Sequence, residues 1–404
     1  MSHGHDTHVP AAPSPIRFPV WTLIVAGLCV AAGAATFLWT LLGGHAGLAW
    51  SAYLAGAFYA LGLGVFGVLW IAMTTLTKGT WAVSMRRIPE AMAAWIIPGA
   101  ILAILVGLGS HSLYSWTDEA VVAADHFLVH KKAFLNMGVF YGISAVAFLV
   151  WTGFSIAIVG NSLRQDTTGK VSHSRAIVTL SAAFVVLFAL TFSAVSFLYL
   201  MSLEPHWFST MFAVLTFTDV VQTGMAFVCL VAAGLVARGA YNGLVNENHL
   251  HAAGTMLFAT TGFWAYIYFC QFLLIWYANI PEETIYFLRR MDNGWLAWIL
   301  VLPVLKFVVP FLFLVPRMSK RTPWKLMAAG AWVLMAQFVE LFVMVAPALG
   351  HGEEAVPAHA PTVEALVTLG FLGAFFLVFA FTLQRRAPVP VKDPGLRECL
   401  EFHH

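Results

Sequence analysis

Charged side chains are scarce in this sequence. Asp, Glu, Lys and Arg make up 10% of the 404 residues, against 60% for hydrophobic residues, and the mean hydropathy is +0.82. A soluble domain usually carries about 25% charged residues, so this composition excludes one and predicts an all-α, polytopic membrane protein. A net charge of only +2, without a basic patch interleaved with aromatics, also argues against a nucleic-acid partner.

Cysteine and histidine patterns that bind metals are missing too. None of the four cysteines lies in a CxxC or CxxCH pattern, and all 15 histidines lie in tails, loops or the ends of apolar runs. Fe–S clusters, zinc sites and c-type haems use such cysteine patterns, and a b-type cytochrome needs histidines deep within its bundle. The chain also has no P-loop, GxGxxG fingerprint or nucleophile elbow. We therefore predict no metal site, no catalytic residue and no haem or cluster of its own.

Long apolar runs are what the sequence has instead. About 20 apolar residues cross a hydrocarbon core of roughly 30 Å as a helix, and continuous rather than alternating apolarity excludes a β-barrel. Ten runs are long enough, at 19–42, 48–76, 90–110, 132–160, 175–201, 208–236, 250–279, 294–316, 324–348 and 363–384. We predict a transmembrane domain over 19–384 between tails at 1–18 and 385–404. Its second to fifth and sixth to ninth helices would form two four-helix bundles, with two helices flanking them.

The distribution of Lys and Arg predicts the orientation. Segments on the side of the termini hold sixteen: Arg17, Lys78, Arg86, Arg87, Arg164, Lys170, Arg175, Arg238, Arg317, Lys320, Arg321, Lys325, Arg385, Arg386, Lys392 and Arg397. Segments on the other side hold four: Lys131, Lys132, Arg289 and Arg290. Because cytoplasmic loops carry the excess of positive charge, we expect both termini in the cytoplasm of a bacterium and the chain in its inner membrane.

Three charged residues lie inside the apolar runs. Asp219 is about 11 residues, or roughly 16 Å, from the outer end of its run, Lys306 about 12 residues and Glu340 about 8. Each such charge costs roughly 2.5–3.5 kcal/mol on insertion scales, so it normally pairs or faces a wet cavity. Pro303 and Pro310 bracket Lys306, and each removes a backbone donor that would otherwise close the helix there.

Polar residues recur at helical spacing around these charges. They are Thr216, Gln222 and Thr223 beside Asp219, Gln337 beside Glu340, and Thr260, Trp264, Tyr268 and Gln271 on the run at 250–279. Residues three and four apart share a helix face, so we expect one polar interior within the second bundle. Two interpretations stay open: a proton or ion path through Asp219, Gln222, Tyr268, Gln271, Lys306, Gln337 and Glu340, or a buried Lys–carboxylate pair that fixes the bundle.

Acidic residues and histidines gather in two of the outer loops. The first loop carries His111, Asp118, Glu119, Asp125, His126 and His130, and the second carries Glu204 and His206. Histidine titrates near neutral pH, so one interpretation is an outer-face site of proton exchange. The alternative is a solvated loop that docks a partner protein.

Three stretches carry a resemblance to a known family. They are "WTDEAVVAADHFLVHKKAFLN" (116–136), "EPHWFSTMFA" (204–213) before the Asp219 run, and "LFATTGFWAYIYFCQFLLIWYANIPEET" (257–284), the most specific of the three. Together with the number of spans and the loop order, they resemble the polysulfide-reductase-like (NrfD-type) membrane subunits. The closest likeness is to the F subunit of alternative complex III, a bacterial quinol:cytochrome c (or other acceptor) oxidoreductase.

The resemblance implies a set of partners and a division of labour. The partners would be a larger paralogous membrane subunit, a periplasmic Fe–S and molybdopterin-like subunit and c-type cytochromes, with a terminal oxidase as a further neighbour. Haem c and Fe–S clusters would lie on those partners, and menaquinol or ubiquinol would be oxidised next to the larger paralogue. The F subunit itself would hold a proton path without its own redox centre.

The sequence thus predicts an integral membrane subunit of a quinol-oxidising respiratory complex that supports assembly and proton conduction. Two alternatives remain: a stand-alone secondary transporter that uses the buried charges for ion coupling, and a purely structural anchor. Inverted repeats and broken helices are typical of transporters. Lys306 lies between two prolines, but the sequence has no evident inverted repeat.

Overall fold

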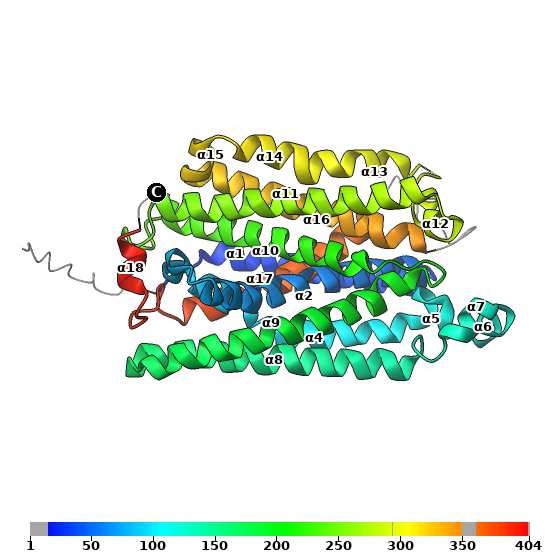
Figure 1. Cartoon of the computed structure of the whole chain (residues 1–404), viewed down its shortest axis with the longest axis horizontal. Coiled ribbons are helices and arrows are strands. Elements are labelled where there is room, and N and C mark those ends of the chain that lie inside the picture. The colour runs from blue at the N-terminus through cyan, green and yellow to red at the C-terminus, as the bar shows by residue number, and fades with distance from the viewer. Residues whose placement is uncertain (1–14, 293, 350–360, 403–404) are drawn as a thin grey trace, which may run out of the picture.

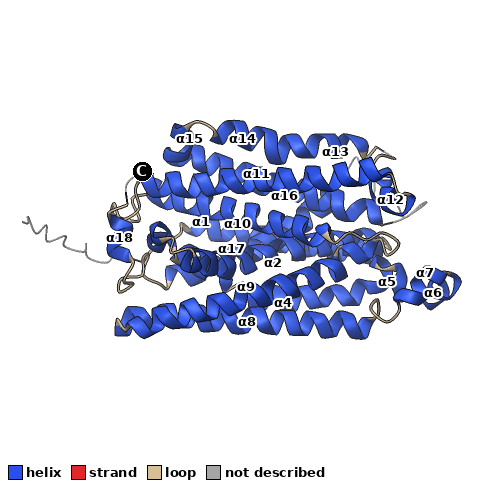
Figure 2. Ribbon diagram, viewed as in Figure 1, coloured by secondary structure: helices blue, strands red, loops and turns tan. Residues whose placement is uncertain are grey.

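The protein is an array of roughly parallel helices (Figures 1 and 2). A computed structural model describes residues 15–292, 294–349 and 361–402, and this part of the chain contains helices, turns and no strand. Ten of its helical segments are long and apolar enough to cross a membrane: Val20–Leu42, Ala46–Leu76, Arg87–Leu113, Met137–Thr168, Val171–Leu203, Met211–Ala237, Glu247–Ala278, Leu296–Leu314, Pro323–Ala348 and Thr362–Gln384. The predicted all-α, multi-pass architecture is therefore confirmed.

The helix bounds differ from the predicted spans mainly at one helix. Helix α8 (Met137–Thr168) was predicted over 132–160, but it begins later and continues for two more turns through polar residues such as Asn161 and Asp166. Hydropathy detects only the part of a helix that lies in hydrocarbon. The backbone hydrogen bonds of α8 continue beyond that part, so its end could not be located from apolar residues alone.

The helices form the two predicted bundles. The first contains α2 (Ala46–Leu76), α3 (Arg87–Ala93) with α4 (Ile96–Ile104), α8 and α9 (Val171–Tyr199). The second contains α10 (Met211–Ala237), α11 (Glu247–Ala278), α13 (Leu296–Pro303) with α14 (Val309–Leu314), and α16 (Pro323–Val345). The flanking helices α1 (Val20–Leu42) and α17 (Thr362–Gln384) pack together against α2.

Helix α2 lies at the centre and joins the bundles. It contacts α10 and α16 of the second bundle as well as its own neighbours, and its most apolar 18 residues are all buried. Close approach to α10 depends on Gly224, where a Cβ atom would lie 2.0 Å from the ring of Phe66. The hydroxyl of Tyr59 also donates a hydrogen bond of 2.6 Å to the carbonyl of Leu334 on α16. The two bundles therefore share one continuous apolar core.

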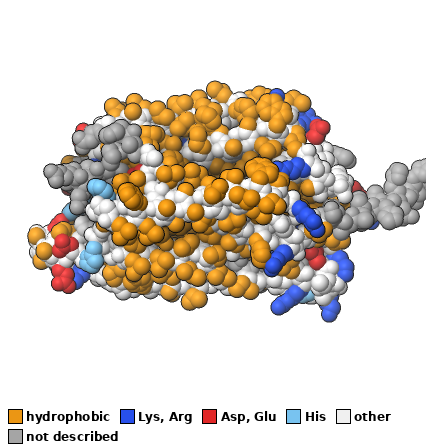
Figure 3. All heavy atoms as spheres, turned by 180° about the vertical axis from the view of Figure 1, so that it is seen from behind, with side chains coloured by type: hydrophobic (Ala, Val, Ile, Leu, Met, Phe, Trp, Pro, Cys, Tyr) orange, Lys and Arg blue, Asp and Glu red, His pale blue; other side chains and the backbone are white. Residues whose placement is uncertain are grey.

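The two ends of the molecule differ in charge. Figure 3 shows most of the visible Lys and Arg side chains at one end, and most of the visible His side chains, together with several Asp and Glu, at the other. We call the first, which carries Arg86, Arg164 and Arg386, the basic end. We call the second the histidine end; there α6 (Glu119–Ala124) and α7 (His126–Lys131) project beyond the bundles (Figure 1).

The chain after α17 crosses the basic end and contacts both bundles. Asp393 forms an ion pair with Arg86, next to the first bundle. Farther along, in α18 (Leu396–Leu400), the carbonyl of Cys399 lies 3.0 Å from Nε2 of His249 at the start of α11. The histidines in residues 1–14 and at 403–404 lie outside the described residues. So does the segment at 350–360, which carries Glu353 and Glu354.

Candidate functional site: a buried ionic cluster

The site begins with a break in the helix that carries Lys306. Between α13 and α14, residues Val304–Val308 form a π-helical turn. Pro310 has no N–H, so neither the π-type bond to Leu305 nor the α-type bond to Lys306 forms on the backbone. Side chains supply both donors: Trp332 Nε1 lies 2.8 Å from the Leu305 carbonyl, and Gln222 Nε2 lies 3.0 Å from the Lys306 carbonyl. The missing N–H of Pro310 thus accompanies a local opening at Lys306, as the sequence predicted.

The ammonium group of Lys306 lies among three acceptors from two other helices. Its Nζ is 2.8 Å from Asp219 Oδ1 on α10 and 2.6 Å from Gln337 Oε1 on α16, and it also pairs with Glu340 Oε2. The side chain of Lys306 is fully buried, and both carboxylates are nearly so. All three ammonium donors are therefore used, which is the condition for keeping such a charge in a low-dielectric core.

Further hydrogen bonds fix the acceptors in place. Thr223 Oγ1 donates to Gln337 Oε1 at 2.8 Å, and Trp264 Nε1 donates to Glu340 Oε1 at 2.9 Å. Gln222 also donates to the hydroxyl of Thr261 at 3.2 Å. These bonds hold both carboxyl-bearing helices against Lys306. Of the predicted path residues, Asp219, Gln222, Lys306, Gln337 and Glu340 therefore form one hydrogen-bonded cluster.

Two predicted members of the polar stripe have a different role from the one expected. Thr260 is buried but donates to the carbonyl of Leu257 on its own helix, and its neighbour Thr261 contacts Gln222 instead. Thr216 donates to Ser196 Oγ at 2.9 Å, away from the ions. Adjacent residues point in directions about 100° apart around a helix. The sequence alone could not show whether Thr260 or Thr261 faces Gln222.

The charges of the cluster do not balance when all groups are ionised. One ammonium group faces the two carboxyl groups of Asp219 and Glu340. An uncompensated charge in an apolar core is costly, so neutrality requires one proton shared between the carboxyls. Asp219 Oδ2 is buried and has no hydrogen-bond partner among the described residues, which makes it a position where that proton can reside. The cluster can therefore store and release a proton.

A small cavity continues from the cluster toward the histidine end. Its volume is about 20 Å³, and Glu340, Tyr268, Gln271 and Arg290 contribute to its lining. Such a volume holds about one water molecule. Tyr268 stacks on Trp264 with ring centres 4.9 Å apart, and neither amide atom of buried Gln271 has a hydrogen-bond partner in the described part of the chain. The amide thus offers a donor and an acceptor to a water beside Glu340.

Arg290 closes the far side of this cavity. It follows α12 (Pro281–Arg289), and its buried guanidinium donates to the carbonyls of Val343 and Met344 at 3.0 and 2.8 Å and to Glu204 Oε1 at 2.6 Å. Burial alone lowers the pKa of Arg290, but the Glu204 carboxylate outweighs it, and the net shift is upward. Arg290 therefore stays charged between the cavity and the surface.

Sequence reasoning missed Arg290, which it counted only as an outer-loop charge. Its guanidinium lies 3.5 Å from the ring centre of Tyr286, which stacks on Trp207 at 4.2 Å. Burial raises the pKa of Tyr286 to about 12. Tyr286 and Arg290 are four residues apart and follow "NIPEET". This helical spacing could have indicated that the two side chains share one face of a short helix.

Glu204 connects this arginine to an open hollow at the histidine end. The hollow has a volume of about 370 Å³, and its lining includes Glu204, His111, His206 and Arg289. Glu204 was predicted among the exposed groups but is 5% exposed, because it turns inward to Arg290. Glu204 therefore lies between Arg290, which lines the small cavity, and the open hollow.

The other predicted outer-face residues form two pairs rather than one group. Asp125 Oδ2 lies 2.5 Å from Nε2 of His206, and the ring nitrogens of His126 and His130 are 3.2 Å apart. The hydrogen bond with His206, together with the amide of Phe127, lowers the pKa of Asp125. Within the described ranges, no three His, Cys, Asp or Glu side chains gather as a metal site.

The surroundings of the cluster differ along α10. Toward the basic end, α10 continues from the cluster with Met225, Phe227, Val228 and Cys229, all of them buried and apolar. Toward the histidine end lie the polar side chains of Gln271, Arg290 and Glu204. The polar groups that accompany the cluster toward a face therefore lie on the side of the histidine end.

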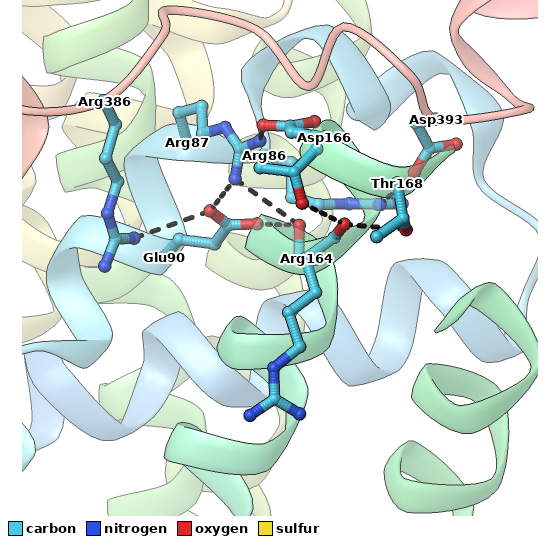
Figure 4. Close-up of polar contacts among 10 residues, drawn as sticks. Arg86, Arg87, Glu90, Arg164, Asp166, Thr168, Arg386 and Asp393 are labelled. Carbon is cyan, nitrogen blue, oxygen red and sulfur yellow. Dashed lines mark hydrogen bonds and ion pairs between the residues drawn. The ribbon is translucent and has the colours of Figure 1, made fainter. Parts of the chain in front are cut away.

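A second ionic cluster lies at the basic end of the first bundle and was also missed (Figure 4). Arg87 pairs with Glu90 and Asp166, and Glu90 accepts a hydrogen bond of 2.5 Å from Ser162. Glu90 is the first residue of the predicted run at 90–110, and Arg87, three residues before it, was counted as a charge outside the membrane. Both are fully buried, because α3 packs against α2 and α17 and because Asp166 and Ser162 of α8 contact them.

Fold and site together define an all-α, multi-pass membrane protein with an ionic cluster buried in its second bundle. A comparison with protein-family models gives no match, and a comparison with curated proteins gives none either. The family resemblance drawn from residues 116–136, 204–213 and 257–284 therefore stays a prediction.

Proposed function

We propose that this chain is a membrane subunit of a quinol-oxidising respiratory complex of the alternative complex III type, and that its second bundle conducts protons. It would lie in the bacterial inner membrane, with the basic end and both termini in the cytoplasm. The observation that carries the proton path is the buried Lys306 between Asp219 and Glu340, followed by a polar route to one face. The resemblance of the segment at 257–284 supports the assignment to that complex.

The proton path follows from the order of groups along the bundle. A proton that enters the open hollow reaches Glu204, which is fixed by Arg290. A water beside Gln271 would link that end of the cavity to Glu340, and Glu340 shares Lys306 with Asp219. The fixed charge of Arg290 opposes free passage of hydronium, so a proton moves by exchange between carboxyl groups and water. This arrangement couples protonation in mid-bundle to the face where His206 and Asp125 lie.

The proposed partners supply the redox chemistry. Haem c and Fe–S clusters would lie on the cytochrome and the molybdopterin-like subunits, and quinol would be oxidised next to the larger paralogue. The projecting α6 and α7, with exposed Phe127 and Val129, give a surface for a periplasmic partner at the histidine end.

Glu340→Gln tests the proton path directly. Glutamine keeps the shape and the bond from Trp264 but cannot carry a proton, so proton translocation by the complex in sealed vesicles should fall by at least about 100-fold. Gln271→Leu should lower it as well, because the cavity loses its water-binding amide. Tyr266→Phe, at a lipid-exposed position on the same helix, is the matched control. Unchanged proton translocation per electron in Glu340→Gln contradicts the path.

Copurification tests the assignment to a complex. A tag on this subunit should recover partners whose haem absorption is reduced by quinol, while the isolated chain should show no haem spectrum. The second candidate, a stand-alone ion-coupled transporter, is favoured by the helix break at Val304–Val308. Recovery of the chain alone, with ion-dependent binding of a small solute, would establish the transporter, and recovery with partners but unaltered proton flux in Glu340→Gln would leave a structural anchor.

A further inference from the structure

A hollow opens on the first bundle, far from the proton path. It lies between α4 and α8, near the basic end, and has a volume of about 240 Å³. Its walls are mainly apolar. Ile97 and Ile156 on its rim are 49% and 62% exposed, so the hollow opens toward the surface that faces lipid. Between Leu163 and Thr152, which both line it, α8 rises about 16 Å, close to the length of an extended acyl chain.

Two hydroxyl-bearing residues, Thr152 and Ser155, are among those that line this hollow. Other hydroxyls of these helices, such as those of Ser144 and Thr191, donate to the carbonyl four residues earlier. Among the described residues, the hydroxyls of Thr152 and Ser155 have no such partner. The hollow thus has polar groups that the protein itself does not use.

Arg386 lines the hollow and has guanidinium N–H groups that its contact with Glu90 does not use. In Figure 4, Arg386 approaches Glu90 from the side opposite to Arg87. Arg87 and Ser162 already hold Glu90 closely, whereas the nearest approach of Arg386 to it is 3.5 Å. The side chain of Arg386 is 17% exposed. Arg87 also pairs with Asp166, so Arg386 is a second counter-ion of Glu90, and its long contact leaves guanidinium N–H groups free to bind a molecule in the hollow.

We propose that this hollow binds a glycerophospholipid with an anionic headgroup. Arg386 holds its phosphate, and an acyl chain lies along α8 beside Ile97, Ile156 and Thr152. Charge complementarity favours this occupant, since Lys and Arg gather at this end of the molecule (Figure 3) and basic pockets between membrane helices bind anionic headgroups. The site depends only on the chain spanning a bilayer and is independent of the proton path.

Lipid retention in defined nanodiscs tests the site. The purified protein, with its partners, is placed in equal parts of phosphatidylglycerol and phosphatidylethanolamine, and tightly bound lipid is counted by native mass spectrometry. Wild type should retain phosphatidylglycerol preferentially, and Arg386→Gln should lower that preference about five-fold, as expected for one lost lipid-facing charge. Arg175→Gln removes an exposed charge at the same end and should leave the preference unchanged.

A steric variant checks the same site without touching its charges. Gly160 lines the hollow, and a Cβ atom there meets nothing within 4 Å. Gly160→Leu should fill the hollow and release the lipid, whereas Gly153→Leu, which also has open space on α8, should not. Equal retention of both lipids by wild type, undiminished retention in Arg386→Gln or Gly160→Leu, or recovery of quinone in place of phospholipid would overturn the proposal.

Discussion

Replacing Lys306 with methionine should destabilise the protein by about 3–5 kcal/mol, the usual cost of removing one member of a buried ionic group. The reason is the cluster's composition: without the ammonium, Asp219 and Glu340 face each other across a dry core. Gln337 also loses its donor from Lys306. We expect a lower melting temperature of the purified complex and less of this subunit in membranes at equal expression.

Asp219→Asn should behave differently from Lys306→Met. If the cluster were a single Lys–carboxylate pair, loss of Asp219 would leave Lys306 uncompensated. The structure places Glu340 and Gln337 on the same ammonium, so one carboxylate still balances one lysine. The Asn variant should assemble and melt near wild type yet lose proton translocation.

Combined variants and a control separate charge from shape. Lys306→Met with Asp219→Asn and Glu340→Gln leaves no charge in the cluster and should recover much of the lost stability. Lys325→Met, whose side chain lies over Trp324 at the basic end, should have little effect on melting. A Lys306→Met protein that melts like wild type, or an Asp219→Asn protein with full proton-coupled activity, would refute the role given to this cluster.

Replacing Arg290 with methionine should be comparably damaging, by about 3–5 kcal/mol. The change leaves the carbonyls of Val343 and Met344 without their donor and Glu204 without its closest cation, all in buried positions. It should also open the cavity to the hollow at the histidine end. We therefore expect earlier melting, and passive proton leak through vesicles for any protein that still assembles.

The neighbouring arginine provides the matched control. Arg289 lies 3.4 Å from Glu204 Oε2, but its side chain is 32% exposed, and exposed ion pairs contribute about 0–1 kcal/mol. Arg289→Met should therefore melt close to wild type. A smaller loss in Arg290→Met with Glu204→Gln than in Arg290→Met alone would confirm the pair, because the double variant leaves no unpaired carboxylate. Equal effects of Arg289→Met and Arg290→Met would show that burial is not what makes Arg290 important.

The amino-acid sequence by itself determined the ten spans and the three charges deep inside them, Asp219, Lys306 and Glu340. Lipid offers the backbone no hydrogen-bond partner, so a long apolar run must be a helix. The sequence shows directly how long each apolar run is. An ion such as Lys306 in that run must be paired, whatever the fold. Pro303 and Pro310 likewise predicted a local opening, since a missing N–H acts within a single helix.

Only the tertiary structure decided which groups meet. Thr261 rather than Thr260 contacts Gln222, because the rotation of α11 against α10 is set by packing across the whole bundle. Arg290 is buried because α12 folds back against the end of α16, and Arg87 because α3 packs against α2 and α17 and Asp166 of α8 pairs with it. Such contacts join residues far apart in the chain, and hydropathy, which measures each segment against lipid alone, has no information about the helices that pack beside it.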